Sequence, residues 1–458
     1  MKTLLKGGTI VGASGSRRAD VLIENEIIAK IGEDLRDIDA RVVDCTGMLL
    51  FPGFIDAHTH FDLDVCNTTT ADNFYTGSRA ALRGGTTTII DFACPNKGES
   101  LQYGLDLWHR KADGNTFCDY GFHMTIDDWN ESIRAELKAM FAQGVSSFKM
   151  YMTYPAMMVG DRDMYWALKE LRSLGGICGV HCENAGVIDG MIAEKKAAGE
   201  MAPSSHPLTR PPHLEAEAVS RLLRIAQTAD APVVIVHLTN AEALLEVERA
   251  RKRGQTVYVE TCPQYLLLDE SLYFNEDYSI AARYVCAPPI RAKAHQDVLW
   301  NALRRGGIQT ISTDHCSFTL TQKDAGRGDF TAIPGGLPGV ETRGELIYSA
   351  GVAQKKIGLD VMCRALSENP AKLYGLFPRK GILKPGSDAD IVIYDPSAHH
   401  VIRAEDCAAN VDYNPYEGFV TFGGIREVWL RGRRVVEHGS ILDAEPRGTY
   451  LARGKCIL

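Results

Sequence analysis

The chain has 458 residues, 45% of them hydrophobic and 24% charged, with a net charge of −8 at pH 7. These values are typical of a globular protein with a sizeable core, and without a basic stripe nucleic acid is not an expected partner. No apolar run is long enough for a transmembrane helix, so no membrane partner is expected. The start lacks a signal-peptide pattern and the twelve cysteines form no Cys-x-x-Cys pair, which favours a reduced, cytoplasmic protein.

Both ends of the chain carry short strand-like runs separated by turn residues. The runs near the start are 3–5, 20–23, 27–31 and 41–44, and similar runs return at 390–394, 426–430 and 434–436. Neither set is large enough to close a core alone, so we predict one small β-sandwich built from both ends. The expected domains are residues 1–50 and 381–458 for the sandwich and tail, with a catalytic domain at 51–380 between them.

Between these ends, eight short apolar runs alternate with helical patterns. The runs are 54–58, 87–91, 118–123, 146–150, 177–181, 233–237, 256–260 and 309–313. Examples of the helical patterns are 133–141 and 214–227. Eight strand–helix units in series predict an α/β protein with a (β/α)₈ TIM barrel. An open, doubly wound sheet is the alternative, and the count of eight disfavours it.

Metal-ligand residue types stand at the carboxyl ends of several of these runs. His58 and His60 are two residues apart, so on an extended chain both imidazoles face the same side. The other residues of this kind are His181, His237 and Asp314. Each alone has an ordinary structural explanation, as we assume for His123. Together, at the barrel end where active sites lie, they predict a metal site.

Lys149 stands inside the fourth apolar run, where a charged amine is costly. Burial lowers the pKa of an amine, and a neutral amine can react with carbon dioxide to form an anionic carbamate that bridges two cations. A lysine that extends its amine to solvent fits the same pattern. The residue pattern alone leaves these two alternatives open.

Several segments together resemble the cyclic amidohydrolases, specifically the dihydropyrimidinase and D-hydantoinase branch. The similar segments are 53–62, 70–81, 84–92, 147–154, 180–184, 236–239, 260–266, 312–316, 336–341, 386–392 and 412–418. This resemblance implies a metal-dependent hydrolase that opens the cyclic amide of 5-substituted hydantoins or dihydropyrimidines to N-carbamoyl amino acids. It also implies a homotetramer with a small cyclic ureide or imide as its substrate.

The resemblance also implies roles for individual residues. One metal ion would be held by His58, His60, carboxylated Lys149 and Asp314, and a second by Lys149, His181 and His237. Zinc is expected first and manganese second, with a hydroxide as a further bridge. Asp314 would act as general acid and base, and the Tyr154 hydroxyl would polarise the substrate carbonyl.

Other features bear on the substrate. Ala287 and Gly335 replace the usual Ser and Asn at positions that hold the ring through backbone atoms. Asp62 stands where dihydroorotases carry an arginine, which disfavours a substrate with a carboxylate. The loops 62–72, 93–97 and 153–161 are expected to meet the ring substituent, although Met157 and Met158 slightly favour core packing. An allantoinase-like hydrolase is the alternative, and a non-catalytic scaffold relative a less favoured one.

Overall fold

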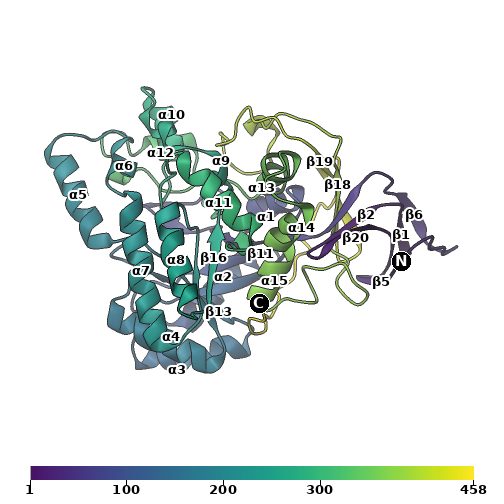
Figure 1. Ribbon diagram of the computed structural model, residues 1–458, viewed down its shortest axis with the longest axis horizontal. Coiled ribbons are helices and arrows are strands. Elements are labelled where there is room, and N and C mark those ends of the chain that lie inside the picture. Colours follow the sequence, from purple (N-terminus) through teal and green to yellow (C-terminus); the bar gives the residue numbers. More distant parts are fainter. Residues whose placement is uncertain (1) are drawn as a thin grey trace.

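A parallel sheet of eight strands forms the centre of the molecule (Figure 1), whose computed structural model describes residues 2–458. The strands are β8 Phe54–Thr59, β11 Thr86–Ala93, β12 Asp119–Thr125, β13 Ser147–Tyr151, β14 Ile177–His181, β15 Val233–Ile235, β16 Val257–Thr261 and β17 Thr310–Ile311. Each pairs with the next along the chain. The sheet closes because the His60 amide donates to the His315 carbonyl (2.8 Å). The TIM barrel predicted from the sequence is confirmed.

Helices cover the outside of this barrel, so its strands are buried on both faces, as in β11, where every residue is buried. The longer helices are α1 Phe74–Arg83, α2 Leu101–Ala112, α3 Glu131–Ala142, α4 Asp161–Leu174, α5 Ala185–Ala197, α7 Pro212–Ala229, α8 Ala241–Lys252 and α11 Ala294–Arg304. The shorter ones are α6 Ser205–Leu208, α9 Pro263–Leu267, α10 Tyr278–Arg283, α12 Leu320–Asp324, α13 Arg343–Ile347, α14 Leu359–Cys363 and α15 Asn369–Leu373. Side-chain caps define several starts; Asn73, for example, accepts from two amides of α1.

Two further sheets form the sandwich predicted from both chain ends. The four-stranded sheet contains β5 Ile27–Gly32, β4 Asp20–Glu24, β1 Lys2–Lys6 and β6 Arg41–Asp44, in this order. The seven-stranded sheet contains β21 Ser440–Ile441, β20 Arg433–Glu437, β19 Gly424–Leu430, β18 Ile391–Asp395, β7 Leu49–Pro52, β2 Thr9–Gly12 and β3 Gly15–Arg18. Strands from the two ends of the chain meet where β18 pairs with β7.

Strand β18 shows how the sandwich joins the barrel. Its residues alternate, with Ile391 and Ile393 in the core between the two small sheets and Val392 and Tyr394 in the main core of the barrel. Successive side chains of a strand point to opposite faces, so one strand serves both cores. The exact domain bounds, 1–50, 51–380 and 381–458, stay a prediction.

The last residues of the chain leave the sandwich and pack against the barrel. The Leu451 amide donates to the Tyr120 carbonyl (2.7 Å), and Arg453 is buried. Its guanidinium donates to the Ser147 hydroxyl (2.7 Å) and to the Phe122 carbonyl. The tail therefore links strands β12 and β13.

We expect Arg453→Met to lower the free energy of unfolding by about 3 kcal/mol, because carbonyls that accept from a buried charge lose their donor. Urea unfolding followed by circular dichroism measures this change. Arg447→Met, in the same tail but half exposed, is the control and should change it by less than about 0.5 kcal/mol. Equal effects of the two substitutions would contradict the role given to Arg453.

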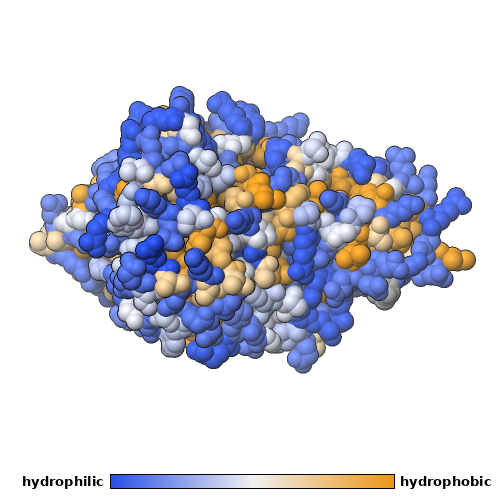
Figure 2. Space-filling model, turned by 90° about the horizontal axis from the view of Figure 1, so that it is seen from below, coloured by the Kyte–Doolittle hydropathy of each residue, from blue (hydrophilic) through white to orange (hydrophobic). Residues whose placement is uncertain are grey.

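No helix within residues 2–458 is both long and apolar enough to cross a membrane. The face drawn in Figure 2 is largely hydrophilic, with hydrophobic side chains interspersed among the polar ones, as on most folded proteins. None of the twelve cysteines forms a disulfide.

Candidate metal centre and active site

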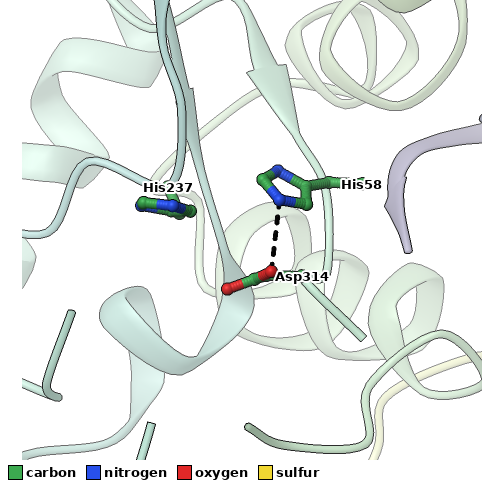
Figure 3. Close-up of side chains that lie close together, drawn as sticks. All are labelled: His58, His237 and Asp314. Atoms are coloured by element: carbon green, nitrogen blue, oxygen red, sulfur yellow. Dashed lines mark ion pairs between the residues drawn. The ribbon is translucent and has the colours of Figure 1, made fainter. Parts of the chain in front are cut away.

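The side chains predicted as metal ligands gather at the carboxyl-terminal edge of the barrel. The ligand atoms of His58, His237 and Asp314 all lie within 4.8 Å of one another (Figure 3). His60 Nε2 lies 3.1 Å from Asp314 Oδ1, and the rings of His181 and His237 are 4.5 Å apart. Residues in or just beyond strands β8, β14, β15 and β17 thus lie close together at this edge of the barrel.

Lys149, in the middle of β13, completes this group. Its side chain is fully buried, and its Nζ has no hydrogen-bond partner among the described residues. The ammonium would lie above the rings of Tyr151 (5.0 Å) and Phe92 (5.1 Å), so the amine does not extend to solvent. An unpartnered buried amine is costly, which indicates that something else occupies this position in the working protein.

Two glutamates orient the histidines, although the sequence alone assigned them no role. Glu260 Oε1 lies 2.6 Å from His58 Nδ1, and Glu183 Oε2 lies 2.8 Å from His181 Nε2. A carboxylate on one ring nitrogen leaves the other nitrogen free to bind a metal and fixes the ring. Both glutamates stood inside segments of the resemblance, but their contacts with these histidines depend on the fold.

Burial sets the protonation that metal ligands need. Desolvation, followed by the charge of Lys149, lowers the pKa of His58 well below its usual value, so the imidazole is neutral. Desolvation alone would raise the pKa of Asp314, but the contacts of its carboxylate with His58 and His60 outweigh this effect and hold the pKa at about 2. Neutral imidazoles beside an ionised carboxylate are a donor set that fits divalent metal ions.

Three candidate site residues adopt left-handed backbone conformations that non-glycine residues rarely use. The φ angles are 36° at His237, 53° at Asp314 and 67° at Tyr154. Such strain is stored where the surrounding structure imposes it, often at active sites. His237 and Asp314 lie two and three residues beyond strands β15 and β17, which end at Ile235 and Ile311, earlier than the runs in the sequence.

Tyr154 follows strand β13 and faces the histidines. Its ring centre is 5.2 Å from that of His181, and the Arg210 guanidinium lies 5.9 Å above the ring. Desolvation raises the pKa of the Tyr154 phenol well above its usual value, so the hydroxyl stays protonated. No protein acceptor for this hydroxyl occurs among the described residues, which leaves it available as a donor.

The two positions predicted to hold the ring lie side by side. A Cβ atom built on Gly335 would be 4.0 Å from the Ala287 nitrogen. Both residues are partly exposed, whereas their neighbours Cys286, Pro288, Pro334 and Gly336 are buried. Backbone atoms of Ala287 and Gly335 are therefore what these two loops offer to a ligand.

The sequence predicts structural roles for two further residues, His123 and Met158. Both ring nitrogens of His123 have protein partners, Ser147 Oγ at 2.6 Å and the Ala57 carbonyl at 3.0 Å, so its structural assignment holds. Met158 is 39% exposed, so core packing is the wrong prediction for it. The reason is that the chain after Tyr154 forms a surface turn, in which the Met158 amide donates to the Tyr154 carbonyl.

Comparison with known proteins agrees with this geometry. A model of the amidohydrolase family matches residues 49–435. A D-hydantoinase of Geobacillus stearothermophilus is 43% identical over 458 residues, which cover 99% of this chain and 97% of that protein. The chain belongs to the amidohydrolase family.

Further relatives place this amidohydrolase in one branch of the family. A D-phenylhydantoinase of Escherichia coli O1:K1 / APEC is 41% identical over 458 residues. The aligned region covers 99% of this chain and 98% of that protein. The crystal structure of dihydropyrimidinase from Brevibacillus agri NCHU1002 is 42% identical, with a TM-score of 0.98 and full coverage of both chains. This amidohydrolase is therefore an enzyme of the hydantoinase and dihydropyrimidinase type.

Proposed function

We propose that this amidohydrolase hydrolyses the cyclic amide of 5-substituted hydantoins or dihydropyrimidines and releases N-carbamoyl amino acids. The observation that carries the proposal is Lys149, a buried amine without a partner beside the ligand atoms of His58, His237 and Asp314. The printed names of the relatives, D-hydantoinase, D-phenylhydantoinase and dihydropyrimidinase, support this class of ring.

We assign the predicted ligands to two divalent ions. The first set is His58, His60, Lys149 and Asp314, and the second is Lys149, His181 and His237. The neutral amine of Lys149 would add carbon dioxide and lose a proton, which gives a carbamate with two oxygens for the two ions. This assignment explains why Lys149 Nζ lacks a protein partner. We propose zinc first and manganese second, since imidazole and oxygen ligands suit both.

The chain's own residues would carry the remaining steps. When bound, two divalent ions would ionise a water near neutral pH and polarise the ring carbonyl. Asp314 would accept the proton from the attacking water and deliver it to the departing ring nitrogen. The Tyr154 hydroxyl would donate to the oxyanion, while Ala287 and Gly335 would orient the ring through backbone atoms.

The competing assignments are weaker. A non-catalytic scaffold relative need not keep metal ligands, whereas this chain has a ligand residue type at every predicted position, and the ligand atoms of His58, His237 and Asp314 lie within 4.8 Å of one another. Metal analysis of the purified protein tests this point, since we expect about two divalent ions per chain. The homotetramer and the cytoplasmic location stay predictions, and light scattering tests the first.

We predict that the enzyme prefers neutral rings to dihydroorotate. Dihydroorotate carries a carboxylate that needs a cationic partner, and Asp62 has the wrong charge at the position that would supply it. We expect kcat/KM for dihydrouracil or 5-phenylhydantoin to exceed that for dihydroorotate by at least about 100-fold, the scale of one lost charge-assisted contact.

A panel with hydantoin, both enantiomers of 5-phenylhydantoin, dihydrouracil, allantoin and dihydroorotate measures these ratios. A ratio below one for dihydrouracil and 5-phenylhydantoin over dihydroorotate would overturn the ring assignment. A preference for allantoin would favour the allantoinase-like alternative. Neither outcome would contradict the proposed metal site.

A further inference from the structure

A buried lysine that the proposed chemistry does not use lies behind the two loops assigned to the ring. Lys323, on the short helix α12, is fully buried. Its Nζ donates to the carbonyls of Val285 (2.7 Å), Pro334 (2.7 Å) and Gly336 (2.8 Å). The three ammonium hydrogens therefore have three acceptors, and no carboxylate is among these partners.

The three carbonyls belong to two loops that are far apart in the sequence. Val285 stands two residues before Ala287, and Pro334 and Gly336 flank Gly335 on both sides. Among the described residues, one hydrogen bond joins the two loops directly, from the Gly336 amide to the Val285 carbonyl (3.0 Å). Lys323 is thus a cross-link between the two loops, directly behind their partly exposed residues.

The contact with Pro334 also fixes the direction of an amide. A trans peptide is planar, and its carbonyl and its N–H point to opposite sides. Because Lys323 holds the Pro334 carbonyl, the N–H of Gly335 points away from the lysine. This amide has no protein acceptor among the described residues. A cation on the carbonyl oxygen also polarises the peptide group and makes its N–H a stronger donor.

A role in packing alone does not account for a charged residue here. A buried cation without a carboxylate costs free energy, and a methionine of similar shape would fill the same space without that cost. Burial lowers the pKa of Lys323 to about 8, so the ammonium still predominates at neutral pH. The charge is therefore needed to hold the three carbonyls, and with them the two loops.

We propose that Lys323 is a positioning residue for the substrate, which holds the Ala287 and Gly335 loops in register and directs the Gly335 amide toward the ring. This inference rests on the proposed function, because it assumes that a cyclic ureide binds between the two loops. It explains how a site can hold its ring by backbone atoms where side chains are absent at Gly335 and minimal at Ala287.

The test compares Lys323→Met and Lys323→Arg with the unmodified enzyme, each loaded with metal. For Lys323→Met we expect KM for hydantoin or dihydrouracil to rise at least about tenfold, the scale of one lost hydrogen bond, with metal content unchanged. We expect kcat to fall less than about threefold, because the groups that move protons are untouched. Lys323→Arg keeps the charge, but its planar group cannot place three hydrogens at the same points, so KM should rise at least about fivefold.

The control is Asp324→Asn, the next residue of the same helix, whose carboxylate accepts from Ser279 (2.9 Å) and touches neither loop. It should leave KM within about twofold. A KM within that limit for either folded Lys323 variant, an equal rise for Asp324→Asn, or loss of metal would overturn the role of Lys323. Failure of both Lys323 variants to fold would overturn it too, by assigning the lysine to stability. If the unmodified enzyme opens no cyclic ureide, the proposed function fails instead, and this role fails with it.

Discussion

Lys149→Ala is expected to abolish ring opening and to release at least one of the two metal ions. The residue stands in β13 with no exposed surface, and its amine has no protein partner. In the proposed site its carbamate would be the only protein ligand shared by both ions. Alanine leaves the other ligands in place but removes the oxygens that hold the pair together, so we expect turnover to fall by more than about 10⁴-fold.

Metal analysis and steady-state kinetics on the same preparation measure this prediction. Short-chain carboxylic acids added to Lys149→Ala should restore part of the turnover, because they fit the space of the lost side chain and supply the missing bridge. Lys169→Ala, on the exposed face of α4, is the control and should keep both ions and full turnover. Full metal content with normal turnover in Lys149→Ala would exclude the bridging role.

Tyr154→Phe is expected to lower kcat by about 10²–10³-fold, the usual effect of removing one donor to an oxyanion. The substitution deletes a single oxygen and keeps the ring contact with His181. Burial keeps the pKa of the phenol raised, so the hydroxyl remains a donor at neutral pH and above. Metal content should not change, because the hydroxyl is not among the assigned ligands.

Kinetics at saturating substrate, with metal content measured in parallel, separate this role from a structural one. Tyr165→Phe, on the outer helix α4 where the ring packs beside Trp166, removes the same oxygen outside the proposed site and should leave kcat unchanged. A fall of less than about tenfold in Tyr154→Phe would show that the hydroxyl does not stabilise the oxyanion.

Much of this architecture is readable from local patterns. The eight apolar runs and the helical periods between them depend on a few neighbouring residues each, and they predicted the barrel strands closely. His58 and His60 lie on one face because strand geometry alone places residues two apart on the same side. The residue types of the proposed metal site could therefore be predicted from the sequence, since parallel barrel strands bring their carboxyl ends to one edge.

The residues at which strands β15 and β17 end could not be predicted from the sequence. The apolar runs continue to His237 and Thr313, but the strands stop at Ile235 and Ile311. Left-handed conformations at His237 and Asp314 are costly for these residue types and persist only where tertiary contacts impose them. No local pattern encodes such a conformation at a histidine.

By itself, the sequence determined the barrel, the double-ended sandwich and the residue types of the proposed metal site. Only the tertiary structure decided which groups support them, such as Glu260, which contacts His58 from 202 residues away in the chain. The same holds for Lys323, whose three carbonyl partners come from two separate loops. Period and spacing are local properties of a chain. These contacts, in contrast, exist only after the barrel closes and brings distant polar groups together. Burial then favours hydrogen bonds between such groups, because water no longer solvates them.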